Sequence, residues 1–310
     1  MEVKKCISFI CLIFFCLTTH SVFAQASGFP VRNGITFSPR WHNNLIFLNN
    51  MEEPLSAEEQ MLYLWAEAWL AGQADRGFAD LADYGNFQRY CKEHGILHIG
   101  GPMLGAVTDT SVSLWLRTVK PAKVEVKLDI AGVEKTFTAP RTSLETELST
   151  AVDIHGLRAN SLYEYRVLVD GKEIDLPENA AIRTAPNNPA QTTRIAFGSC
   201  FHRWGLGNLD QTKTLLERNP HAFFGLGDIA TQDRMNNLGW HSLDYLARDL
   251  YPAWQKLVSR IPFYALWDDH DYFGNDLWGI PEGFTAKDRD KVWKAFRYAW
   301  NNPAYGFGDK

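Results

Sequence analysis

The sequence predicts two architectures in succession, an all-β sandwich followed by an α/β domain with a parallel sheet. Between Gly100 and Asp170, apolar and polar residues alternate with period 2 and no helical pattern intervenes. This alternation is typical of the short antiparallel strands of a sandwich. After Arg194, short apolar strands alternate with amphipathic helical stretches. That order requires crossover connections and therefore a parallel sheet.

Composition and charge exclude several classes of protein. Hydrophobic residues make up 45% of the 310 residues and charged residues 22%, close to globular averages, which argues against disordered and fibrous classes. The net charge of −5 and the lack of a basic block argue against a nucleic-acid partner. A mildly acidic protein still binds phosphate where metal ions supply the positive charge.

Residues 1–24 have the pattern of a secretory signal peptide. Lys4 and Lys5 give a positive start, an apolar run extends from Ile7 to Leu17, and Ala24 ends a small-residue cleavage site. The apolar run is shorter than the roughly 20 residues that a bilayer span needs. We therefore expect export to the periplasm or the outside of the cell, without stable membrane insertion; a membrane anchor is the alternative.

A helical extension is predicted over residues 25–98. The part before Ser56 has no clear period and is assigned no regular structure. Ser56 and Glu59 form a capping-box pattern at the start of a helix. The expected apolar face of this helix comprises Met61, Leu62, Trp65, Trp69 and Leu70. A second helical stretch, Phe78–Glu93, ends before Gly95, a suitable left-handed C-cap.

The β-sandwich is predicted over residues 99–186. Its clearest alternating runs are Ser111–Arg117, Lys123–Asp129 and Tyr163–Val169. The Asp170-Gly171 pair that follows is a hairpin turn signal. Leu157, six residues before Tyr163, resembles the tyrosine-corner arrangement of fibronectin type III domains, which makes the sandwich fibronectin type III-like. A Pro- and Asn-rich segment from Thr184 closes it.

The α/β domain is predicted over residues 193–310, with three strands that each end in possible metal ligands. The expected elements are strand Arg194–Gly198, helix Asn208–Arg218, strand Ala222–Leu226, one amphipathic helix through Leu243, Leu246, Leu250, Trp254 and Leu257, and strand Phe263–Trp267. Cys200 and His202 follow the first strand, Asp228 the second, and the acidic run Asp268–Asp271 the third. Because carboxyl ends of parallel strands share one sheet edge, these side chains are expected to converge.

Each signal alone also has a structural explanation. A lone Cys200 is often a buried apolar residue, Asp228 suits a helix cap or turn, and the acidic run suits a solvated loop. Cys91 and Cys200 are the thiols left after signal removal; they are too few for a disulfide scaffold, although they could pair with each other. The coincidence at three successive strand ends favours a metal site, since clustered carboxylates repel unless cations offset them.

The chain resembles the PhoD-like (alkaline phosphatase D) branch of the calcineurin-like metallophosphatases. The matching segments are Gly198–Cys200, Gly227–Asp228 and Trp267–Asp271, joined by Tyr163–Tyr165, Thr184–Pro186 and Asn302–Gly306. The resemblance runs from about Gly100 to the last residue. It implies that an α/β metallophosphatase domain follows the family's N-terminal sandwich in the sequence. It also implies hydrolysis of small phosphate monoesters or diesters by a water molecule that metal ions activate.

The resemblance also implies roles for single residues. Cys200 takes the first metal-ligand place, with His202 as a second candidate there. Asp228 corresponds to the carboxylate that bridges two metals, and Asp269 to the asparagine of the general Gly-Asn-His-Asp motif. His270 matches the histidine that contacts the phosphate and protonates the leaving oxygen.

Two further positions bear on the metals. Asn275 is a lesser candidate for a metal or phosphate contact. Thr231 stands where PhoD-like enzymes typically carry a tyrosine that binds iron, and a neutral hydroxyl is a poorer ligand for ferric iron than a phenolate. Two or more metal ions are expected, either divalent, such as Ca, Mn or Zn, or including Fe.

The resemblance further implies histidine ligands from later strands, yet no histidine follows His270. We therefore expect only the N-terminal half of the metallophosphatase domain here, with weak metal binding and little turnover. The alternative function is a non-catalytic exported binding module in which the acidic loop holds calcium. Neither of these two functions implies a particular oligomeric state.

Overall fold

The computed structural model describes residues 31–32, 35–36 and 53–303. The expected signal peptide, 1–24, and most of Asn302–Gly306 lie outside this range, so export stays a prediction. None of the described helices is long and apolar enough to cross a membrane. The chain divides into two compact units, Met1–Asn43 and Asn44–Lys310.

In the first unit, β1 (Val31–Arg32) pairs antiparallel with β2 (Ile35–Thr36). The prediction of no regular structure before Ser56 is therefore wrong at these four residues. Strands of two residues are too short to show a period in the sequence.

The second unit begins with α3 (Ala57–Leu70), η1 (Phe78–Ala82) and α4 (Gly85–Glu93). The capping box is confirmed, because the Glu59 amide donates to Ser56 Oγ at 3.2 Å and the Ser56 amide donates to Glu59 Oε2 at 2.9 Å. The apolar face of α3 differs from the prediction, since Trp65 and Trp69 are only partly buried.

The predicted single helix over Phe78–Glu93 is wrong, because a 3₁₀ turn and an α-helix are separated at Tyr84. Tyr84 has extended backbone angles, and its ring stacks on Trp69 with centroids 4.5 Å apart. The chain leaves the helical conformation at the residue whose ring stacks on Trp69, and both rings are partly buried. Gly95 has a φ of +68°, as expected for a left-handed cap.

The sandwich is confirmed as two antiparallel sheets around one core. Its strands are β3 (His98–Gly105), β4 (Ser111–Thr118), β5 (Val124–Ile130), β6 (Val133–Thr138), β7 (Ser149–His155), β8 (Leu162–Tyr163), β9 (Tyr165–Val169), β10 (Lys172–Glu173) and β11 (Ile182–Arg183). The sheet orders are β3-β4-β7 and β10-β9-β5-β6, with a small β11-β8 ribbon. Asp170 and Gly171 both have positive φ in the β9–β10 hairpin. The Tyr163 hydroxyl accepts from the Arg158 amide at 2.7 Å.

The remaining elements are β12 (Ile195–Gly198), α5 (His202–Gly205), α6 (Leu209–Arg218), β13 (Ala222–Leu226), α7 (Leu238–Leu250), α8 (Pro252–Val258), β14 (Phe263–Leu266), α9 (Asp269–Tyr272) and α10 (Ala286–Ala299). Strands β12, β13 and β14 pair in parallel in that order, which confirms the predicted sheet. The predicted single helix through Leu243 and Leu257 is wrong, because Tyr251 is extended before Pro252.

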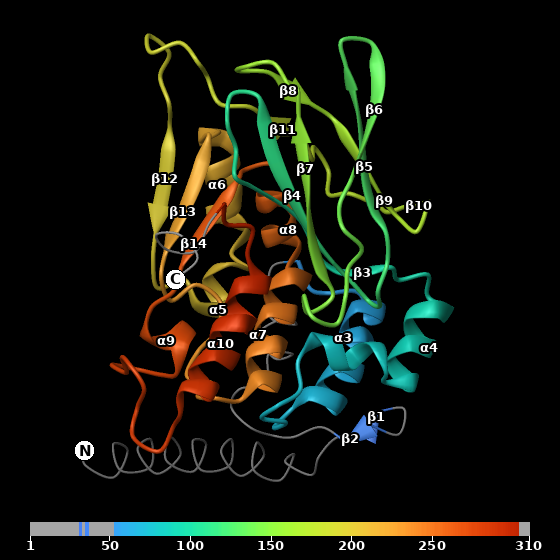
Figure 1. Ribbon diagram of the computed structural model, residues 1–310, viewed down its shortest axis with the longest axis vertical. Helices are drawn as coiled ribbons and strands as arrows, with labels where there is room; N and C mark the ends of the chain where they lie inside the picture. The colour runs from blue at the N-terminus through green and yellow to red at the C-terminus, as the bar shows by residue number, and fades with distance from the viewer. Residues whose placement is uncertain (1–30, 33–34, 37–52, 304–310) are drawn as a thin grey trace, which may run out of the picture. The chain divides into compact units, whose positions relative to one another are not determined.

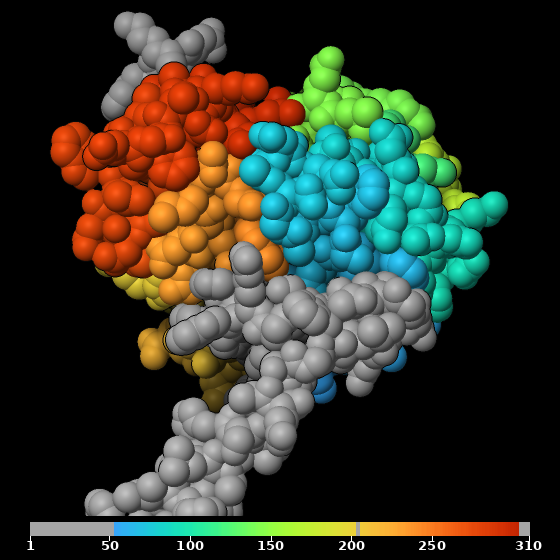
Figure 2. Space-filling view, turned by 90° about the horizontal axis from the view of Figure 1, so that it is seen from below, coloured from blue at the N-terminus to red at the C-terminus, as the bar shows by residue number. Residues whose placement is uncertain are grey.

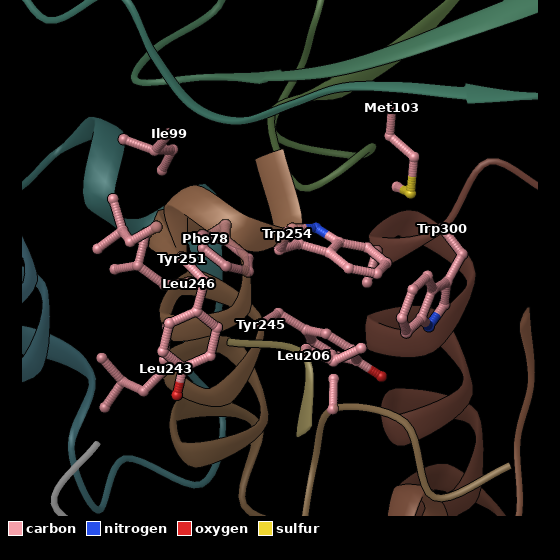
Figure 3. Packing of buried hydrophobic residues seen from close by; sticks show 14 of the residues in the cluster. Phe78, Ile99, Met103, Leu206, Leu243, Tyr245, Leu246, Tyr251, Trp254 and Trp300 are labelled. Atoms are coloured by element: carbon pink, nitrogen blue, oxygen red, sulfur yellow. The ribbon is translucent and has the colours of Figure 1, made fainter. Parts of the chain in front are cut away.

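One large core joins the α-helices to the sandwich and the parallel sheet. Figure 1 shows the sheet of β12–β14 beside the sandwich, with α3, α7 and α10 grouped below. Helices α3, α7 and α10 also form a continuous surface in Figure 2. Inside, Trp254 packs edge-on against Trp300 with centroids 6.0 Å apart, and Met103 of β3 lies close by (Figure 3). The helical extension and the sandwich therefore share a core with the α/β part.

The parallel sheet has one covered and one open face. Phe223, Phe263 and Ala265 point into the core and are buried. On the alternate positions Ile195, Phe197, Leu226 and Leu266 are exposed, Phe197 to 73%. An open apolar face is unusual for a parallel sheet, because such sheets are normally covered on both sides.

Candidate metal centre

The backbone at the tips of β12 and β13 is held in a left-handed conformation. Cys200 and Asp228 have φ of +56° and +53°, and Gly227 has +98°. A Cβ at Gly227 would lie 2.5 Å from the Cβ of Asp268, so only glycine fits between the two strand ends. Left-handed non-glycine residues are uncommon and concentrate at functional sites.

Short contacts tie the first strand tip to the second. The Cys200 amide donates to the Gly227 carbonyl at 3.2 Å, and the His202 amide donates to the Asp228 carbonyl at 2.9 Å. Cys200 Sγ lies 3.5 Å from Asp228 Oδ2. Cys200 and Cys91 are both free thiols. The thiol of Cys200 is thus available beside the carboxylate, as the sequence predicts.

Asp228, Asp269 and His270 form a group that fits a metal ion. One ligand atom from each lies within 4.8 Å of the other two. Ligands at about 2.0–2.2 Å from an ion lie at most about 4.4 Å apart, so a small side-chain movement closes the group around one. The His202 ring lies edge-on to the His270 ring, with centroids 5.1 Å apart.

Asp228 supplies the strongest sign that a cation belongs here. Its side chain is only 7% exposed, and its Oδ1 has no hydrogen-bond partner among the described residues. A buried carboxylate oxygen without a donor is costly. A metal ion bound at this oxygen would remove that cost. The oxygen and nitrogen ligands of this group therefore fit the expected metals.

Asp233 holds His270 in place, a role that the sequence did not reveal. Asp233 Oδ1 lies 2.7 Å from His270 Nδ1 and accepts from the Asn275 amide at 2.8 Å. Burial lowers the pKa of His270, but the hydrogen bond and charge of Asp233, with Asp228 and Asp269 nearby, outweigh it and raise the pKa above its usual value. The only sequence signal was an acidic residue in the loop after Asp228.

Asn275 lies at the rim of this group. Its amide is bound to Asp233, while its side chain donates to Asp276 Oδ2 at 2.6 Å. The Asp276 amide donates to Asp269 Oδ2. Burial raises the pKa of Asp269, but the amides of Asp276 and His270 and the His270 charge more than offset this and lower it.

Asp271 and Thr231 serve the loop rather than the metal group. The buried Asp271 carboxylate accepts from the Ile229 amide at 3.1 Å and the Ala230 amide at 3.3 Å. Burial raises the pKa of Asp271 to about 7. The Thr231 hydroxyl donates to the Asp271 carbonyl at 3.2 Å and is fully buried. Asp271 thereby fixes the turn that presents Asp228.

Comparison with known structures agrees with this architecture. The structure is similar to that of PhoD at 20% sequence identity and a TM-score of 0.50, over 65% of this chain and 45% of the PhoD chain. The chain has a metallophosphatase-like fold. It spans less than half the length of the PhoD chain that it matches.

Residues 97–187, which contain the sandwich, match a domain of unknown function, DUF7800. Purple acid phosphatase PPD1 from yellow lupin (Lupinus luteus) seeds is similar at 14% identity and a TM-score of 0.47, over 66% of this chain and 41% of that chain. No curated protein sequence matches the chain.

Proposed function

We propose that this chain carries the N-terminal part of an exported, PhoD-like, metal-dependent phosphoesterase that hydrolyses phosphate mono- or diesters. The observation that carries the proposal is the buried, donor-free Oδ1 of Asp228 within the group it forms with Asp269 and His270. The metallophosphatase-like fold supports it. A fibronectin type III-like identity of the sandwich belongs to the same proposal.

Of the three residues that fit a metal ion, Asp228 and Asp269 are assigned as ligands and His270 as the proton donor. Asp228, Asp269, Cys200 and His202 would hold divalent ions, which when bound supply the positive charge that a phosphoryl group and its attacking water need. His270 would face the phosphoryl group, because Asp233 occupies its Nδ1 and leaves Nε2. Nε2 is then the atom that would donate a proton to a leaving oxygen.

We also infer that further polypeptide completes this site. The open apolar face at Phe197, Leu226 and Leu266 suits a second layer of chain, and PhoD extends well beyond the part matched here. Burial of such a face stabilises by roughly 25 cal/mol per Å² of apolar area. The described chain alone is then expected to bind metal weakly and to turn over little substrate.

A metal titration tests the ligand assignment. Calorimetric titration of the chain with Mn²⁺ and Zn²⁺ is expected to show binding that Asp228→Asn weakens about tenfold or more, since it replaces an anionic ligand by a neutral one. Asp153→Asn, exposed on β7, is the matched control and leaves the affinity unchanged.

Equal affinities of wild type and Asp228→Asn would refute the site, and binding of calcium alone by the acidic loop would favour a binding module. Hydrolysis of 4-nitrophenyl phosphate and bis(4-nitrophenyl) phosphate is measured in parallel. Robust turnover would contradict the inference that the site is incomplete.

A further inference from the structure

A recess of about 300 Å³ adjoins the candidate metal centre at the loop between α9 and α10, which lies at the lower left of Figure 1. An apolar cavity of about 150 Å³ is large enough to bind benzene, so this recess has room for an aromatic ring. The side chains that matter for its chemistry are Trp267, Asp269, Tyr272, Leu277, Trp278 and Arg289.

The walls of the recess are aromatic and rigid. Trp267 packs against Tyr272 and Trp293 with ring centroids 4.8 Å apart in each pair. Trp267 also contacts Phe296 of α10. The inner wall is therefore fixed by the core rather than by solvent-exposed side chains.

The outer wall is Trp278, whose indole is 87% exposed. Its loop has a defined path, because the Tyr272 hydroxyl donates to the Gly279 carbonyl and Gly279 takes a φ of +68°. The Leu277 amide donates to the Gly274 carbonyl at 3.0 Å. The Trp278 indole therefore has a ring face that other described side chains do not cover.

The recess adjoins the metal group through one shared residue. Asp269 belongs to both, and the amide of Asp276 in the Trp278 loop donates to Asp269 Oδ2. The amide of Asn275 in the same loop is bound to Asp233. A phosphoryl group at the metal ligands would therefore place the organic part of its ester next to the indoles.

Charge selects the kind of group that fits. Asp268 and Asp269 line the recess, whereas the Arg289 guanidinium is paired with Asp290 at 2.7 Å. The recess thus disfavours a second anionic group, and a neutral flat ring can stack on the indoles without that repulsion.

We propose that this recess receives the aromatic part of the alcohol that leaves from the phosphate ester, the ring of an aryl ester or the base of a nucleotide whose nucleoside leaves, by stacking on Trp278. The proposal rests on the phosphoesterase function proposed above for the same site. Aromatic stacking on a protein side chain contributes about 1–3 kcal/mol, which is enough to distinguish aromatic from aliphatic esters.

Ligand affinities of the whole chain with Mn²⁺ test this. Trp278→Ala is expected to weaken binding of 4-nitrophenyl phosphate and of adenosine 5′-monophosphate roughly 5- to 150-fold, and to leave glycerol phosphate within about twofold. Trp278→Phe retains most of the affinity. Comparing the loss of affinity for 4-nitrophenyl phosphate with that for adenosine 5′-monophosphate shows whether the recess prefers an aryl ring or a nucleobase.

A metal-free measurement separates this proposal from the phosphoesterase proposal. Saturation-transfer NMR with adenosine and 4-nitrophenol, which carry no phosphate, is expected to show ring contacts in wild type that Trp278→Ala loses. This holds even if Asp228→Asn leaves metal binding unchanged. Unaltered aromatic binding by Trp278→Ala, or an equal loss for glycerol phosphate, would overturn the stacking role.

Discussion

Glu67 is a buried carboxyl group in α3 whose ionisation opposes folding. Its side chain is 3% exposed, and neither carboxylate oxygen has a hydrogen-bond partner within the described part of the chain. Burial raises the pKa of Glu67 from 4.5 to about 7. The folded state therefore holds a proton that the unfolded state releases above about pH 4.5.

The size and sign of the effect follow from this difference. Stability is highest below the unfolded pKa, falls as the pH rises from 4.5, and levels off above about 7. Each pH unit over that window is worth about 1.4 kcal/mol, so the total is about 3 kcal/mol. Glu67→Gln removes the ionisation and keeps a polar group of similar size.

Urea unfolding at pH 5 and pH 8, followed by far-ultraviolet circular dichroism, measures the prediction. Glu67→Gln is expected to match wild type within about 1 kcal/mol at pH 5 and to be about 3 kcal/mol more stable at pH 8. Other titrating groups act on both proteins and cancel. Glu93→Gln, exposed at the end of α4, is the control. A stability difference that is the same at both pH values would refute the reasoning.

Two predictions concern close packing and the histidine. Gly239→Ala would place a Cβ 1.9 Å from the Leu70 carbonyl oxygen and is expected to lower the free energy of unfolding, measured in urea, by about 2 kcal/mol or more. Gly85→Ala is the control and should leave stability unchanged, because no atom lies near its Cβ. Equal stabilities of the two variants would contradict the close approach at Gly239. Asp233→Asn is expected to lower the pKa of His270, because the charge and hydrogen bond of Asp233 raise it. The pKa is read from the His270 ring protons by NMR in metal-free protein. An unchanged or higher pKa would contradict the pairing of the two residues.

Local patterns in the sequence predicted much of the fold. The Asp170-Gly171 turn and the Ser56 cap depend on a few neighbouring residues, and both form as expected. The convergence of Cys200, Asp228 and His270 followed from a topological rule, since parallel strands end at one edge. These features need no knowledge of distant contacts.

The features that the sequence did not reveal depend on contacts across the chain. Asp233 and His270 are 37 residues apart, and no periodicity relates them. The break at Tyr84 follows from stacking on Trp69, which appears only when α3 is in place. Pro252 was visible as a helix start, but the apolar spacing on both sides of it favoured one continuous helix.

The end of α10 has a consequence for how this chain can be divided. The Tyr298 carbonyl accepts from Trp115 Nε1 at 3.2 Å and from Arg117 at 2.8 Å, both on β4. Asn301 donates to the carbonyls of Met103 and Ser113 at 2.8 and 3.0 Å.

The Asn301 hydrogen bonds are buried and those of Tyr298 are partly buried, and all of them would be lost if the sandwich were removed. The sandwich is therefore structurally part of the α/β half rather than an appended module. Expression of residues 194–310 alone is expected to give an insoluble product, and a shorter soluble version of this chain should begin upstream of β3.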